Sequence, residues 1–107
     1  MILKISFFFS ALLASGDFGK IRGKILTAED PNPLLGVNIS ILETNLGAVS
    51  DAQGNYTIIG IPSGTYSVRF DYIGRQQKTF QNVYVEGSLS TVLDVQLSQS
   101  VIEGETV

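Results

Sequence analysis

The 107-residue sequence contains no cysteine, no histidine and no tryptophan. Without these side chains the chain can form neither a Ser-His-Asp nor a Cys-His catalytic group, and no zinc site with His or Cys ligands. Seven basic and ten acidic residues give a formal charge of −3, which leaves no electrostatic footprint for nucleic acid. The composition therefore predicts no catalytic residue, no cofactor and no metal ion, and the chain is not expected to be an enzyme.

The first sixteen residues have the pattern of a secretory signal peptide. Lys4 precedes an uncharged run over residues 5–14, and Ala14-Ser15-Gly16 supplies the small residues of a cleavage site. A membrane-spanning helix needs about 20 apolar residues, so no membrane insertion is expected. We predict an exported protein with a signal peptide over residues 1–16, one domain over residues 17–98 and an exit tail over residues 99–107.

Apolar and polar residues alternate through the remaining sequence with the period of two that is typical of half-buried strands. The clearest example is residues 65–72, where every second side chain is Tyr, Val or Phe. No window shows the apolar spacing of a helix. Six further strands are predicted over residues 19–27, 36–42, 48–50, 55–61, 76–85 and 89–97.

Two of these runs depart from strict alternation. Ile59 and Ile61 lie on the opposite side from Ile58, which predicts a strand that is covered on both faces or lies near an edge. A phase change within residues 76–85 predicts a bulge near residues 81 and 82. Seven short strands of this kind predict an all-β fold, an antiparallel β-sandwich with one core between two layers.

Glycine, proline and aspartate mark the turns between the runs. The segment Asp51-Ala52-Gln53-Gly54 predicts a tight turn in which the carboxylate accepts backbone N–H groups. Pro62-Ser63-Gly64 predicts a second turn with Gly64 in the left-handed region, where Gly64→Val would cost about 1–3 kcal/mol. The other turn residues singled out are Gly36 and Gly74.

Four segments resemble, in order, those of the carboxypeptidase regulatory-like domain: GVNISI at 36–41, SDAQGNY at 50–56, IPSGTY at 61–66 and YIG at 72–74. Ser50, Ile61 and Arg75 differ from the residues usual in that family, without altering the turns. The resemblance implies a seven-stranded, transthyretin-like sandwich of Greek-key type. It also implies a module that follows the signal peptide in many TonB-dependent outer-membrane receptors, including the SusC-like group.

By this resemblance, the chain is expected to be a non-catalytic module on the periplasmic side of the outer membrane, part of a receptor for nutrient uptake. Its expected partners are the plug and barrel of that receptor or the periplasmic energising machinery, and residues 101–107 are similar to a segment leading into a TonB box. Two alternatives stay open. One is a stand-alone exported binding or adhesion module with carbohydrate as its ligand, and the other is an accessory domain of a secreted carboxypeptidase.

Other candidate sites have simpler explanations. Asp51, Gln53 and Asn55 carry oxygen atoms at alternate positions but lack the further carboxylates of a calcium loop. Glu29-Asp30 lies beside two prolines and is expected to be a solvated loop rather than a catalytic carboxylate pair.

The tyrosines are the remaining candidates, because an aromatic ring can stack on a sugar. Tyr66 and Tyr72 are in phase with the apolar row of their strand, so we expect them to pack in the core. Tyr84 is out of phase with its apolar neighbours and is the candidate for an exposed contact.

Overall fold

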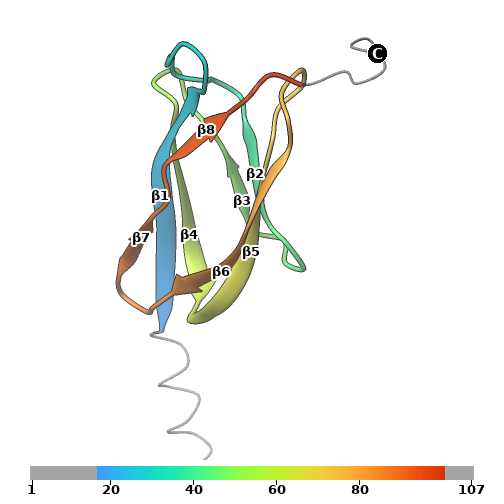
Figure 1. Cartoon of the computed structure of the whole chain (residues 1–107). Helices are drawn as coiled ribbons and strands as arrows, with labels where there is room; N and C mark the ends of the chain where they lie inside the picture. Colours follow the sequence, from blue (N-terminus) through green and yellow to red (C-terminus); the bar gives the residue numbers. More distant parts are fainter. Residues whose placement is uncertain (1–16, 101–107) are drawn as a thin grey trace, which may run out of the picture.

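The computed structural model describes residues 17–100, and all of the regular structure in that range is β-strand (Figure 1). Sheet 1 has the strand order β4-β1-β7, with β8 also paired to β1, and sheet 2 has the order β3-β2-β5-β6. The two sheets face each other, so the predicted two-layer all-β fold is confirmed. The strands are β1 (Phe18–Thr27), β2 (Asn38–Ile41), β3 (Gly47–Val49), β4 (Asn55–Pro62), β5 (Gly64–Asp71), β6 (Lys78–Val85), β7 (Ser90–Val92) and β8 (Val95–Leu97).

The predicted number and direction of the strands are wrong in sheet 1. The run over residues 89–97 is divided into β7 and β8, and both run parallel to β1. Sheet 1 is therefore mixed, because β4 pairs with β1 in the antiparallel direction. Alternation determines which face of a strand is buried and carries no information about the direction of its partner, so the pattern could not reveal this pairing.

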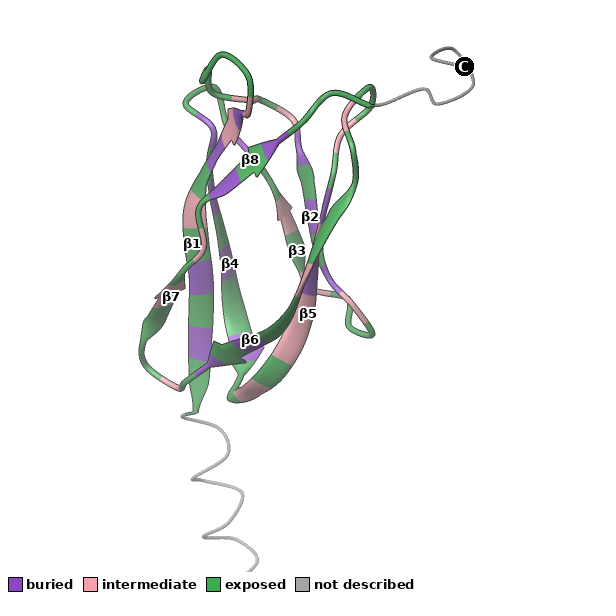
Figure 2. Ribbon diagram, in the orientation of Figure 1, coloured by how far each residue is buried: buried purple, intermediate pink, exposed green. Residues whose placement is uncertain are grey.

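The core lies between the sheets and takes alternate residues from each strand, as the banding along β1 in Figure 2 shows. Ile21 and Ile25 are fully buried, which confirms the inward row predicted for this strand. Phe70 is at the centre, and the rings of Tyr56 and Phe80 meet it edge-on at centroid distances of 5.5 and 5.7 Å. Burying a side chain of this size stabilises the fold by about 1.5–3 kcal/mol.

A bulge in β4 explains the phase change around Ile59. The register against β1 shifts between Gly19 and Ile21, so Ile59 and Gly60 together lie opposite one residue of β1. Gly60 has a φ of 71°, which is typical of such a bulge. The bulge turns Ile61 into the core and leaves Ile59 69% exposed, so β4 is covered on one face, at the edge of its sheet.

Gly64 is not the left-handed residue that the sequence predicted. Its φ is not positive, and it begins β5 in a pair with Val85 of β6. The atoms nearest to a Cβ at Gly64 would belong to Tyr66, with the hydroxyl oxygen at 3.5 Å, an ordinary contact distance. The connection from Pro62 to Gly64 passes from sheet 1 to sheet 2, so it is not a hairpin and does not require the turn geometry of one.

Sheet 2 confirms the bulge predicted near residues 81 and 82. The register of β5 against β6 shifts between Tyr66 and Val68, and Asn82 has a φ of 61°. Asparagine adopts this conformation more readily than most residues do. After the bulge, Val83 and Val85 both face the core.

Candidate functional site

Residues 17–100 contain no group of three or more Asp, Glu, His or Cys side chains placed to hold a metal ion. Within the same range no helix is long and apolar enough to cross a membrane. The features that remain to be considered are turns, one ion pair, the contact between β1 and the last two strands, and the outer faces of the sheets.

The turn around Asp51 connects β3 of sheet 2 to β4 of sheet 1. Asp51 Oδ1 accepts hydrogen bonds from the backbone N–H groups of Gln53 and Asn55, each at 2.9 Å. Gly54 has a φ of 81°, and a Cβ there would lie 2.5 Å from the carbonyl oxygen of Ile25. The carboxylate is therefore engaged with the backbone, and it fixes the entry into β4.

The other turn residues singled out in the sequence also make contacts within the fold. Gly36 and Gly74 have φ values of 90° and 84°. Pro62 ends β4, and its carbonyl oxygen accepts a hydrogen bond from the Tyr66 hydroxyl at 2.5 Å. These contacts position strands within the fold.

The buried hydroxyl of Ser50 is a contact that the sequence analysis missed. Ser50 Oγ accepts a hydrogen bond from the Val37 N–H at 2.9 Å and donates one to the Leu34 carbonyl at 2.6 Å. The side chain is 2% exposed, so both backbone groups depend on it. The resembled family has threonine at this position, and this shared hydroxyl could have indicated the role of Ser50.

Glu29 forms an ion pair with Arg75, which lies in the connection between β5 and β6. Arg75 Nη1 also donates to the Leu97 carbonyl at 3.0 Å. The hydrogen bond from Arg75 lowers the pKa of the Glu29 carboxyl below its usual value. A general acid in glycoside hydrolysis needs a raised pKa, so this environment opposes a catalytic role for Glu29.

Strands β7 and β8 are separated by Leu93 and Asp94, and at this point the chain passes close to Gly23 of β1. A Cβ at Gly23 would lie 2.0 Å from the Leu93 carbonyl oxygen, so only glycine allows this approach. The same oxygen accepts the Tyr56 hydroxyl at 2.6 Å, and Asp94 Oδ1 accepts the Lys24 N–H at 2.9 Å. Burial, together with the Asp94 charge, raises the pKa of Tyr56 above its usual range, so this hydroxyl stays a donor.

The tyrosines do not form one aromatic surface. Tyr56 is in the core, and Tyr66 and Tyr72 are half-buried against it, in agreement with their predicted phase. Tyr84 on β6 is 59% exposed, and its carbonyl oxygen accepts the Thr91 hydroxyl at 2.8 Å. The ring of Tyr84 therefore stands apart from the other three.

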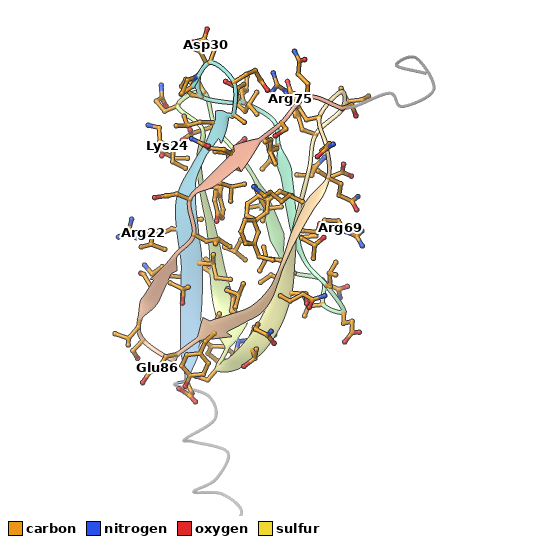
Figure 3. The ribbon with its side chains drawn as sticks, in the orientation of Figure 1. Arg22, Lys24, Asp30, Arg69, Arg75 and Glu86 are labelled. Carbon is orange, nitrogen blue, oxygen red and sulfur yellow. The ribbon has the colours of Figure 1, made fainter. Side chains whose placement is uncertain are left out.

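The outer face of sheet 1 carries a row of cations that we call the basic row: Lys20, Arg22 and Lys24. All three are exposed on β1, and Figure 3 shows Arg22 and Lys24 pointing away from sheet 2. An open hollow of about 400 Å³ lies beside Arg22 and Lys24, and Asn55, Thr57, Val92 and Asp94 also line it. The alternation of β1 had placed the three cations outside, but their grouping was not recognised as a candidate site.

The fold defines an all-β sandwich module. The sequence profile of the CarboxypepD_reg-like domain matches residues 21–107, so the chain belongs to this family. The resemblance seen in the four sequence segments is therefore confirmed. The family is a non-catalytic regulatory or structural module.

Among known proteins, the chain is similar to the N-terminal region of TonB-dependent receptor P3 from Formosa agariphila. The two are 32% identical over 92% of this chain. The match covers 10% of the receptor, so the chain spans about a tenth of the length of this relative. The relationship associates the chain with proteins of the cell envelope.

Solved structures with a similar fold include a type II cohesin–X–dockerin complex from Acetivibrio cellulolyticus. The TM-score is 0.62 at 21% identity, over 72% of this chain and 52% of that one. The minor pilin GBS52 from Streptococcus agalactiae gives a TM-score of 0.60 at 13% identity, over 80% and 46% of the two chains. At these identities the similarity shows the fold alone.

Proposed function

We propose that this chain is the N-terminal, periplasmic module of a TonB-dependent outer-membrane receptor for nutrient uptake. The observation that carries the proposal is the 32% identity to such a receptor across nearly the whole chain, at a tenth of the receptor's length. The module acts by protein–protein contact with the plug, the barrel or the energising machinery, or it acts as a spacer between them.

The architecture supports a contact role. Strands β3, β4 and β6 each lie at an edge of a sheet, and an edge strand can pair with an extended segment of another protein. The polar side chains of the turns and of the ion pair are occupied by contacts within the fold. Surfaces and edges are therefore what the domain offers to a partner.

The proposal includes the two ends of the chain. Residues 1–16 and 101–107 lie outside the described residues, and we assign them as a signal peptide and as the approach to a TonB box. Mass spectrometry of the chain after expression in a Gram-negative host tests the first assignment. We expect an N-terminus at or near Asp17 in a periplasmic or outer-membrane fraction, and an intact chain in the cytoplasm would contradict it.

The receptor role is tested by deleting codons 17–98 within the complete reading frame and measuring nutrient uptake. We expect normal amounts of barrel in the outer membrane together with reduced uptake. Replacing the segment by an unrelated β-sandwich of similar length separates a spacer role from a specific contact. Uptake should return if the domain is a spacer and stay reduced if it makes a specific contact. Unchanged uptake after the deletion would contradict the proposal.

A further inference from the structure

We propose that the outer face of sheet 1 binds an acidic segment of a partner polypeptide, which lies in extended conformation along the basic row. The inference rests on the proposed contact function, and it specifies the chemistry of the partner. It begins with the placement of charge. Six cations lie in residues 17–100, and three of them are the outward side chains of a single strand, β1.

The three cations of the basic row have no carboxylate partner within the described part of the chain. The ion pair found there joins Arg75, between β5 and β6, to Glu29, between β1 and β2. Asp94 lines the same hollow as Arg22 and Lys24, and its Oδ1 accepts the backbone N–H of Lys24. Three cations in the row against one carboxylate at the hollow leave an excess of positive charge on this face for an external anion.

The surroundings of the row favour a polypeptide. Val92 of β7 pairs with Arg22 and is 52% exposed, and Ile59 of β4 is 69% exposed on the other side of β1. A row of charge between two apolar side chains fits a chain that carries both carboxylates and aliphatic groups. A nucleic acid or polysaccharide backbone would leave these apolar side chains without contacts of their own kind.

The spacing of the row matches an extended chain. Side chains on one face of a strand recur about every 6.6–6.8 Å, so Lys20 and Lys24 are about 13 Å apart along β1. An extended peptide with glutamate at every second residue presents carboxylates at the same interval. Beside the row, Asn55 and Thr57 are the cross-strand partners of Lys24 and Arg22 and add neutral polar groups at the hollow.

The negative net charge of the rest of the chain also favours binding of an acidic partner at the basic row. The chain as a whole has a charge of −3, so an acidic partner is repelled elsewhere and attracted here. Sheet 2 offers the contrast, since its central strand β5 carries Arg69 beside Asp71 on the outer face. Figure 3 shows Arg69 on the side of the sandwich opposite to Arg22.

The test is fluorescence anisotropy of the 107-residue chain with a labelled eight-residue peptide of alternating Glu and Thr. We expect saturable binding that weakens as salt is raised. Arg22→Gln should raise the Kd about threefold and the combined Lys20→Gln/Arg22→Gln/Lys24→Gln change about tenfold or more. The matched control is Arg69→Gln, which removes the same charge from the other sheet and should leave the Kd unchanged.

Two further probes fix the class of partner. A peptide of the same composition with its four Glu residues in one block should bind more weakly, because the spacing is lost. Vesicles of anionic phospholipid and a twelve-nucleotide single strand should bind no better to the wild type than to the triple variant. Loss of peptide binding equally in Arg22→Gln and Arg69→Gln would overturn the proposal, as would vesicle or oligonucleotide binding that alone depends on Arg22.

Circular dichroism of each variant guards against a folding defect. Lys20, Arg22 and Lys24 are exposed, so their substitution should leave the spectrum unchanged, and the spectrum matters most for Arg69→Gln, because Arg69 is half-buried. The peptide assay and the uptake assay can fail separately. Reduced uptake after deletion together with no peptide binding would overturn this inference and leave the receptor role standing. Peptide binding together with unchanged uptake would overturn the receptor role and leave this inference standing.

Discussion

Sheets 1 and 2 share one core but are held together by contacts of different range. Sheet 2 is antiparallel throughout, and its β5–β6 pair joins strands that are close in sequence. Sheet 1 depends on β1 meeting the end of the domain, as in the bond from the Lys24 N–H to Asp94, seventy residues away. In sheet 2 the pairs β2–β3 and β5–β6 join neighbouring strands of the chain and only β2–β5 is long-range, whereas every pair of sheet 1 joins β1 to a strand far along the chain.

The largest expected loss of stability comes from a comparison of two glycine substitutions, one in β1 of sheet 1 and one in β5 of sheet 2. Gly23→Val would place a Cβ 2.0 Å from the Leu93 carbonyl oxygen, so we expect a loss of more than about 3 kcal/mol or no folding at all. Gly64→Val would place a Cβ 3.5 Å from the Tyr66 hydroxyl oxygen, an ordinary contact, and should cost less than about 1 kcal/mol. Urea unfolding of both variants measures the difference, and equal losses would contradict it.

The second effect concerns the region where the chain passes from sheet 2 to sheet 1. Ser50→Ala removes the buried partner of the Val37 N–H and the Leu34 carbonyl, and we expect a loss of about 2 kcal/mol. Ser40→Ala is the matched control, because Ser40 is exposed on β2 and its loss should stay within about 0.5 kcal/mol. A Ser50→Ala variant as stable as the control would show that these backbone groups find other partners.

A smaller loss is expected at the break between β7 and β8. Asp94→Ala leaves the Lys24 N–H to water, and we expect about 1 kcal/mol, since this hydrogen bond is exposed. Asp94→Asn keeps an oxygen at this position and should retain part of the stability. Chemical unfolding of the pair separates the hydrogen bond from the charge, and identical losses would argue against the hydrogen bond.

The smallest effect is a pH dependence at the ion pair that joins the β1–β2 and β5–β6 connections. Arg75 lowers the pKa of Glu29 in the folded state, so the pair stabilises the fold at neutral pH. This contribution is lost as the pH falls through the lowered folded pKa. Wild type should therefore melt slightly above Glu29→Gln at pH 7, and the two melting temperatures should converge in acid. A gap that persists or grows in acid would contradict the assignment.

The sequence predicted the layers, the inward rows and the bulge at residues 81 and 82, because each leaves a local mark in the alternation. It assigned the positive φ to Gly64, whereas Gly60 has it, because both glycines lie near one turn signal and only the register shows which one forms the bulge. The close approach of Leu93 to Gly23 could not be predicted from the sequence pattern, because it joins residues far apart in the chain. The basic row was visible as a pattern, but the lack of an ion pair to it within residues 17–100 depends on the folded arrangement.

We propose that this domain works by contact through the outer face of sheet 1. Amide chemical-shift mapping of the 107-residue chain, titrated with the alternating Glu-Thr peptide, tests it most directly. We expect chemical-shift changes concentrated at residues 20–24, at Thr57 and at Val92, with sheet 2 unaffected. Shifts centred on β5 and β6, or none at millimolar peptide, would contradict it.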